Sequence, residues 1–194
     1  QHIIFAINKS QSMIFKRKIY DELLRWKRTD EGRTAVLIQG ARRVGKSTVA
    51  EEFATNEYDT HILVDFAACS SEIRDLFNDV SDLNRIFMRL QLEYGIELKE
   101  RKSAIIFDEV QLAPKARQAI KYLVKDGKYD YIETGSLISI RKNVKDILIP
   151  SEEVKVHMFP MDYEEFKWAL GDTATIKLLQ SCFHNRTSLG DATN

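Results

Sequence analysis

The chain has 194 residues, of which 44% are hydrophobic and 30% charged, and this balance indicates one globular domain with a sizeable core and a small appendage. Lysine plus arginine and aspartate plus glutamate both number 29, so the formal net charge of zero provides no overall field to attract nucleic acid or an anionic membrane. Because no apolar run approaches the roughly 20 residues that span a bilayer, we expect no membrane association and a cytoplasmic protein.

The N-terminal part of the chain is predicted to be helical. Residues 1–13 lack the charged start and long apolar core of a signal peptide, and Met13 is a candidate start of the natural chain, with the residues before it foreign to it. Over residues 14–28, apolar side chains recur at the spacing of an amphipathic helix. The basic run Lys16–Lys18 within this helix is interpreted as a solvated face without a chemical role.

An apolar run over residues 34–39 predicts a buried strand, and it leads into Gly40–Ser47, which reads GARRVGKS. This string has the pattern glycine, any four residues, glycine, lysine and serine, and residues 46–54 after it predict a helix. A chance match in a plain turn is the alternative, but the strand before the pattern and the helix after it favour a phosphate-binding loop. Gly40 and Gly45 permit backbone angles and close approaches that a Cβ would forbid.

The residue types of this loop suit a nucleoside triphosphate, ATP, bound together with Mg²⁺. Loop amides and the helix N-terminus direct donors and a partial positive charge at phosphate oxygens. Lys46 adds a full charge toward the β- and γ-phosphates, and Ser47 offers a hydroxyl to Mg²⁺. One of Arg42 and Arg43 could face phosphate and the other a carboxylate or a second subunit, and the sequence leaves open which. The predicted nucleotide-binding residues are Gly40, Ala41, Arg42, Arg43, Val44, Gly45, Lys46, Ser47 and Thr48.

Strands alternate with helices along the rest of the chain. Further strands are predicted at 61–66, 104–107, 129–133 and 154–159, with helices over 71–93, from Pro114 to Gly127 and from Asp162 to Gly171. This alternation predicts an α/β fold with a mostly parallel sheet and helices on both faces. Right-handed crossovers in such a sheet bring the carboxyl ends of the strands to one edge, where ligands bind.

Two carboxylates, Asp108 and Glu109, follow the apolar strand at 104–107. Because side chains alternate in direction along a strand, the two carboxylates point different ways. We predict that Asp108 contributes to the Mg²⁺ shell, through water, and that Glu109 is the general base that polarises the attacking water. A solvated acidic pair is the alternative, but the phosphate loop about 60 residues upstream favours the functional interpretation.

Thr134 and Ser136 end the next predicted strand and are expected to take part in catalysis. Their hydroxyls could hydrogen-bond the γ-phosphate or the lytic water and so sense hydrolysis, the alternative being an ordinary turn. Arg141 and Lys142 follow, and we interpret them as a surface pair rather than as a charge supplied to another subunit.

The cysteines and histidines predict no metal centre of their own. Cys69 and Cys182 lack the Cys-x-x-Cys spacing of metal and redox motifs, so we expect free thiols in a reducing compartment. The four histidines are scattered along the chain, whereas metal sites need clustered ligands.

The motifs GARRVGKS, IIFDEVQ, YIETGSLISI and MFPMDYEEFKWALG, in this order and spacing, resemble the prokaryotic AAA+ ATP-binding proteins related to the archaeal ATPases. The resemblance covers residues 14–171 and implies a P-loop NTPase three-layer sandwich with a five-stranded sheet of order 5-1-4-3-2. By family pattern, the matching residues are Lys46 and Ser47 for the phosphate-loop pair, Asp108 and Glu109 for the Walker B pair, and 134–136 for the sensor-one region.

The resemblance also implies parts that this sequence does not contain. Such proteins continue into a helical lid, a winged-helix segment and a nuclease-like C-terminal domain. Residues 172–194 match only the start of the lid, so the chain reads as a fragment without a recognisable sensor-two arginine. Many relatives carry Gly-Arg before the fifth strand, where this chain has Pro150–Glu153, and this difference leaves the arginine finger unassigned.

Motifs and resemblance together predict Mg²⁺-dependent ATP binding and hydrolysis that drives or gates attached domains, with slow turnover in this fragment. The alternative is a nucleotide-gated binding switch with little turnover. A small-molecule or nucleoside kinase is disfavoured because a glutamate beside Asp108 serves to activate water. The expected partner is a nucleotide, and a homo-oligomer and a nucleic acid bound through missing C-terminal domains stay open.

Overall fold

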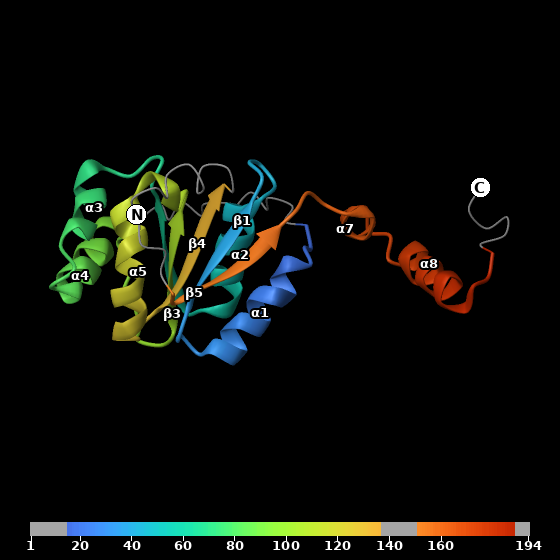
Figure 1. The fold of residues 1–194 in the computed structure, drawn as a ribbon, viewed down its shortest axis with the longest axis horizontal. Helices are drawn as coiled ribbons and strands as arrows, with labels where there is room; N and C mark the ends of the chain where they lie inside the picture. Colours follow the sequence, from blue (N-terminus) through green and yellow to red (C-terminus); the bar gives the residue numbers. More distant parts are fainter. Residues whose placement is uncertain (1–14, 137–150, 189–194) are drawn as a thin grey trace, which may run out of the picture. The chain divides into compact units, whose positions relative to one another are not determined.

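The computed structural model describes residues 15–136 and 151–188, and its described strands form one five-stranded parallel sheet. The strands are β1 (Ala35–Gly40), β2 (Thr60–Asp65), β3 (Ser103–Asp108), β4 (Asp130–Ser136) and β5 (Glu153–Met158). Their order is β2-β3-β4-β1-β5, and every neighbouring pair is parallel (Figure 1). The predicted fold class and the order 5-1-4-3-2 are therefore confirmed, because the two orders are the same sheet read from opposite edges.

The strand bounds differ from the predicted ones by one residue, except at the end of β4, which extends to Ser136 instead of residue 133. Thr134 and Ser136 lie inside this strand, in register with Ile38 and Gly40 of β1. Parallel pairing thus continues to the first residue of the phosphate loop, and the hydroxyls of β4 lie beside the start of that loop rather than in a turn after the strand.

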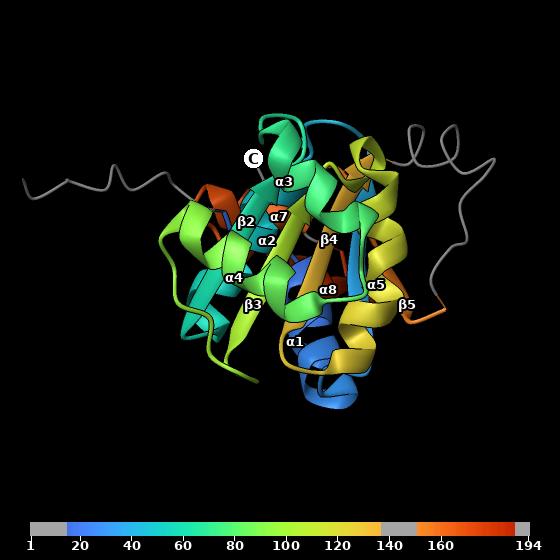
Figure 2. The ribbon, with the colours of Figure 1, turned by 90° about the vertical axis from the view of Figure 1, so that its left-hand side faces the viewer.

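Helices cover both faces of the sheet, as predicted. The described helices are α1 (Ile19–Asp30), α2 (Lys46–Glu57), α3 (Ser71–Asp75), α4 (Leu83–Tyr94), α5 (Pro114–Asp126), α7 (Tyr163–Ala169) and α8 (Ala174–Asn185), with short 3-10 turns at Leu76–Asn78 and Val110–Leu112. Helices α1 and α2 pack on one face, and α3, α4 and α5 pack on the other, in front of the strands in Figure 2. The result is a three-layer α/β/α sandwich.

The alternation of side chains along β1 shows how one strand serves both layers. Val36 and Ile38 belong to the core beneath α1 and α2, whereas Ala35 and Leu37 belong to the core beneath α3, α4 and α5. All six residues of β1 are buried. A strand buried on both faces is a continuous apolar run in the sequence, and this is the pattern that made β1 predictable.

Helix ends follow their local chemistry. Ser70 caps α3 by accepting a hydrogen bond from the Ile73 amide at 3.3 Å, as its residue type predicts. Pro114 occupies the first turn of α5, and Gly127 ends that helix with a φ of 73°. The segment predicted as one or two helices over 71–93 is divided into α3 and α4, and Asp82 caps the second of these.

A buried polar cluster lies under α5 and contains one residue each from β4 and β5, the two strands that flank β1. The Arg117 guanidinium holds the Glu153 carboxylate with two hydrogen bonds from Nη2 at 3.1 Å, and the Glu153 side chain is fully buried. Glu133 is also fully buried, and neither of its carboxylate oxygens has a hydrogen-bond donor among the described residues. Burial, followed by the negative charge of Glu153, raises the pKa of Glu133 well above its usual range. A protonated Glu133 can donate to Glu153, which an ionised one cannot.

The substitution Glu133→Gln is expected to stabilise the protein at pH 8, by on the order of 1 kcal/mol. A carboxyl with a raised folded-state pKa stabilises the fold only while it keeps its proton. Its contribution is complete below the ordinary glutamate pKa and declines as the pH rises through the folded-state pKa. Glutamine has the same shape and supplies an N–H donor at every pH, so urea unfolding at pH 5 and pH 8 should show a flatter pH dependence.

The matched control is Glu97→Gln, at an exposed carboxylate, which should leave both stability and its pH dependence within about 0.5 kcal/mol of the original. Equal destabilisation of Glu133→Gln at both pH values would contradict a proton on Glu133.

Residues 17–162 form one compact unit, and the second unit contains residues 15–16 and 163–188 of the described chain. In the second unit, Asp172 accepts hydrogen bonds from Lys167 at 2.8 Å and from the amide and hydroxyl of Thr175 at 3.0 and 2.7 Å. These contacts lower the pKa of Asp172 and cap α8. Among residues 163–188, only Glu165 and Ile176 are buried. Across the described ranges, no helix combines the length and apolar character needed to cross a membrane.

Candidate functional site

The loop Gly40–Ser47 leaves the carboxyl end of β1 and enters α2, which is the strand–loop–helix context that the sequence predicts. Gly40 packs so closely on β5 that an added Cβ would lie 2.1 Å from the Met158 carbonyl oxygen. Gly45 has a φ of 94°, which side chains with a Cβ rarely adopt. Both glycines are therefore needed, the first for close approach of two strands and the second for the turn into the helix.

The N-terminus of α2 is open to an anion. Gly45 precedes the helix, no side chain caps it, and its first turn carries no acidic residue. By contrast, α1 carries Asp21 and Glu22 in its first turn. The first amides of a helix have no intrahelical acceptor, and the helix dipole adds a partial positive charge to them. Phosphate oxygens supply the acceptors that these amides lack.

Lys46, at the start of α2, is held inside the loop. Its side chain is 5% exposed, and its Nζ donates a hydrogen bond to the Ala41 carbonyl oxygen at 2.8 Å. Burial lowers the pKa of Lys46, and the nearby carboxylates of Glu109 and Asp108 oppose that shift. The ammonium group therefore sits between the loop backbone and the two carboxylates, where it can exchange a carbonyl oxygen for a phosphate oxygen.

Ser47 and Asp108 meet although 61 residues separate them in the sequence. The Ser47 hydroxyl donates to Asp108 Oδ1 at 2.6 Å, so the loop after β1 and the end of β3 form one site. A hydroxyl and a carboxylate are hard oxygen donors, which suit Mg²⁺, and two protein donors suffice because this ion keeps several waters and binds phosphate oxygens. The residues present therefore fit the predicted metal.

Thr134 lies beneath the carboxylates rather than at the open edge of the site. It is fully buried, its hydroxyl donates to Asp108 Oδ1, and its oxygen accepts from the Glu109 amide at 3.3 Å. The hydroxyl is engaged with Asp108, and its predicted hydrogen bond to the γ-phosphate or the lytic water stays a prediction. Thr134 can position both acidic residues through these two bonds.

Glu109 occupies an uncommon backbone conformation, with a φ of 52°. A left-handed backbone at a residue with a Cβ is rarely populated and is often found at functional sites. The Glu109 carboxylate accepts a hydrogen bond from the side-chain amide of Gln111, and Gln111 is itself buried. The partly exposed Glu109 therefore has a defined direction, set by its backbone and by Gln111.

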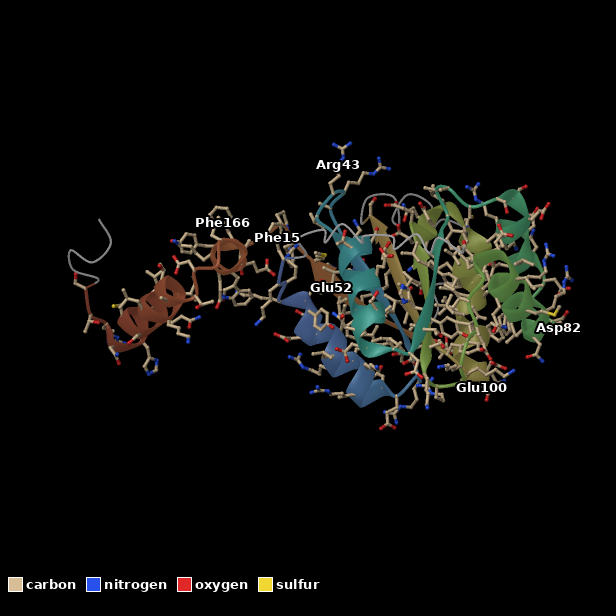
Figure 3. All side chains as sticks on the ribbon, turned by 180° about the vertical axis from the view of Figure 1, so that it is seen from behind. Phe15, Arg43, Glu52, Asp82, Glu100 and Phe166 are labelled. Carbon is tan, nitrogen blue, oxygen red and sulfur yellow. The ribbon has the colours of Figure 1, made fainter. Side chains whose placement is uncertain are left out.

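The other predicted residues differ in exposure. Arg42 and Arg43 are both exposed, and Figure 3 shows Arg43 projecting away from the ribbon. Arg43 also has a positive φ, 63°. Ser136 is buried beside Gly40, with which it pairs across β4 and β1. Arg141 and Lys142 lie outside the described residues, as do residues 1–14, which contain the candidate start Met13.

Two residues near the site were not predicted. The interpretation of Lys16–Lys18 as a solvated run is wrong for Arg17, which is 7% exposed and donates to the Val44 and Phe159 carbonyls at 2.9 and 2.7 Å. A short basic run has no feature that separates one buried arginine from its exposed neighbours. For Gln111, the only indication in the sequence is its position two residues after Glu109.

Relatives were expected to carry Gly-Arg before the fifth strand, where the described part of this chain has 151–153, and β5 begins at Glu153. The Glu152 carbonyl accepts a hydrogen bond from the Ala35 amide at 2.8 Å, and Glu153 is the buried partner of Arg117. This stretch, from residue 151 onward in the described chain, therefore anchors the edge strand.

The chain is similar to a known protein family and to solved structures. A family model described as an AAA domain matches residues 32–167. Among solved structures, the chain is similar to C. elegans PCH-2, with 9% identity and a TM-score of 0.44 over 88% of this chain and 50% of that one. It is also similar to the RuvB Holliday junction branch migration motor of Thermotoga maritima, with 12% identity and a TM-score of 0.46 over 84% of this chain and 52% of that one. The chain thus spans about half the length of these structures. No curated protein matches it.

Proposed function

Because this chain belongs to the family of AAA domains, we propose that it binds ATP with Mg²⁺ and hydrolyses the γ-phosphate to drive or gate attached domains. The observation that carries this proposal is the 2.6 Å hydrogen bond from Ser47 to Asp108, which joins the phosphate loop to the acidic end of β3. A chance sequence match would give no reason for these two residues to meet.

Each residue has a part that follows from its position. The loop amides and Lys46 bind the β- and γ-phosphates, and Lys46 leaves the Ala41 carbonyl to do so. Ser47 and Asp108 hold the metal ion, which supplies charge neutralisation at the phosphates when bound. Thr134 keeps Asp108 and the Glu109 backbone in place. Ser136 supports the start of the loop at Gly40.

Glu109 acts on water. Its carboxylate takes a proton from a water molecule as the water oxygen attacks the γ-phosphorus, and the bond from that phosphorus to the β,γ-bridging oxygen breaks. The products are ADP and inorganic phosphate. Phosphoryl transfer gains about 10³–10⁵ in rate from an arginine at the γ-phosphate, so we expect slow turnover where no second subunit supplies one.

Removing Mg²⁺ is expected to weaken ATP binding about tenfold or more and to abolish phosphate release. Titration calorimetry with ATP, in excess Mg²⁺ and again in EDTA, measures the first effect. Ser47→Ala should bind ATP with little difference between the two conditions, because it has lost one of the two metal donors. Ser71→Ala, at an exposed serine that starts α3, is the matched control and should keep the full difference.

The two conditions separate the parts of the proposal. Failure of ATP to bind in either condition would contradict nucleotide binding itself. Equal affinity with and without Mg²⁺ in the unaltered protein would contradict only the metal-binding roles of Ser47 and Asp108.

A nucleotide-gated switch is the second candidate, and the contact between Gln111 and Glu109 favours it. An amide bound to the carboxylate of the general base competes with water for the same oxygens. Tight ATP binding without phosphate release by the full-length protein would support the switch. The sequence leaves open a second copy of the chain, and a nucleic acid bound through C-terminal domains, as further partners.

A further inference from the structure

Arg17 connects two segments that lie far apart in the sequence. It precedes α1, is almost wholly buried, and its two terminal nitrogens bind different carbonyl oxygens. Nη1 donates to Val44 in the phosphate loop at 2.9 Å, and Nη2 donates to Phe159, just after β5, at 2.7 Å. A guanidinium is suited to this task because it is planar, always charged, and presents several donors in a fixed geometry.

The bond to Val44 determines the direction of a loop amide. In a trans peptide the C=O and the following N–H point in opposite directions within one plane, and the described chain has no cis peptide. A guanidinium on the Val44 carbonyl therefore turns the Gly45 N–H away from Arg17. The Gly45 amide is one of the loop donors proposed to bind phosphate. Gly45 has a φ of 94° and no side chain, so the bond from Arg17 restricts a peptide that is otherwise free to turn.

The bond to Phe159 joins the same guanidinium to the chain that leaves the sheet. Lys18, the next residue, makes an ion pair with Asp162 at 2.7 Å, so the turn before α1 holds this segment at two points. Gly40, at the other end of the loop, packs against the Met158 carbonyl. The phosphate loop is thus connected to the end of β5 at both its first and its fifth residue.

We propose that Arg17 is a positioning residue of the nucleotide site, which orients the Gly45 amide for phosphate and transmits the state of the loop to the segment after β5. This inference rests on the proposed nucleotide binding. When phosphate binds the loop amides, the Val44–Gly45 peptide is held from both sides, and the shared guanidinium orders residues 159–162 as well. The contacts made by Arg17 therefore link the occupancy of the site to the exit of the chain from the sheet.

The first test compares affinities for ATP with Mg²⁺ by titration calorimetry, at a temperature where each variant is folded. Arg17→Met keeps the length of the side chain without its donors, and we expect its affinity to fall about ten- to a hundredfold, as for loss of charged hydrogen bonds. Arg17→Lys keeps the charge but cannot bind both carbonyls in one plane, so it should recover part of that loss. Arg28→Met is the matched control, at an exposed arginine in the last turn of α1, and it should bind within about twofold of the original.

The second test measures amide hydrogen exchange with and without nucleotide. If Arg17 had a purely structural role, replacing it would not alter the effect of nucleotide on exchange. In the unaltered protein, ATP with Mg²⁺ should slow exchange over residues 159–162, and Arg17→Met should lose this response. Without nucleotide, Arg17→Met should exchange the Gly45–Ser47 amides about tenfold faster, while the amides of the last turn of α5 stay unchanged.

These outcomes distinguish the inference from the proposed function. If ATP does not bind the unaltered protein but Arg17→Met still loosens the Gly45–Ser47 amides, nucleotide binding fails and the positioning of the loop stands. Wild-type affinity in Arg17→Met, or unchanged exchange over residues 159–162 when ATP binds, overturns the inference. Should Arg17→Met fail to fold, Arg17→Lys and the exchange measurements on the unaltered protein decide the question.

Discussion

Replacing Glu109 by glutamine is expected to lower the rate of phosphate release about 10²–10⁴-fold while ATP affinity changes by no more than about threefold. Glutamine has nearly the same size but cannot accept a proton from the attacking water. The phosphate loop and the metal donors are untouched, so binding should persist. The measurement is steady-state phosphate release by the full-length protein, with ATP affinity determined in parallel.

The matched control for this variant is Glu51→Gln, an exposed carboxylate on α2, the helix that follows the phosphate loop. It should leave both turnover and affinity unchanged. Unchanged turnover in Glu109→Gln would show that Glu109 is not the general base. A loss of affinity as large as the loss of turnover would instead indicate that Glu109 holds the site together, through the strained backbone at this position.

Lys46→Ala is expected to weaken ATP binding about a hundredfold or more. The ammonium group is buried, bonded to the Ala41 carbonyl and close to the two carboxylates, so its removal takes away a full positive charge at the centre of the site. Without it, the negative charges of Asp108 and Glu109 repel the triphosphate with less compensation. Calorimetric titration with ATP and Mg²⁺ measures the effect.

Lys121→Ala serves as the control, because Lys121 is exposed on α5, on the opposite face of the sheet. Its affinity should equal that of the unaltered protein. Lys46→Ala should also remain folded. Burial lowers the pKa of Lys46, which means that keeping the ammonium group charged costs desolvation energy, and the substitution removes that cost. ATP binding of normal strength by a folded Lys46→Ala would remove the basis for the proposed function.

Much of the fold was predictable because its signals are local. The run over residues 34–39 is apolar at every position but its ends, as a strand buried on both faces requires, and β1 is fully buried. Pro114 and Gly127 mark the ends of α5 through their own backbone preferences. The order of the strands came from the family resemblance, and the structure confirms it.

Other features were not predictable because they depend on pairs of residues that only folding brings together. The end of β4 was placed too early, since pairing with β1 continues the strand through Thr134 to Ser136 whatever their turn-forming tendency. The raised pKa of Glu133 follows from its complete burial and then from the negative charge of Glu153, and no single residue indicates either. The Gln111 contact with Glu109 depends on a left-handed backbone at Glu109 that the sequence does not reveal.

The sequence by itself determined the chemistry of this protein: the phosphate loop at Gly40–Ser47, the acidic pair at the end of β3, and the alternation that brings them to one edge of a parallel sheet. These are local patterns, in which residue type and spacing are sufficient. Only the tertiary structure decided which polar side chains are buried and what they hold. Arg17 and Lys18 are adjacent and carry the same charge, yet one is enclosed against Val44 and the other is exposed beside Asp162. Burial depends on packing between segments more than a hundred residues apart, here α1 and the end of β5, which composition and spacing do not record.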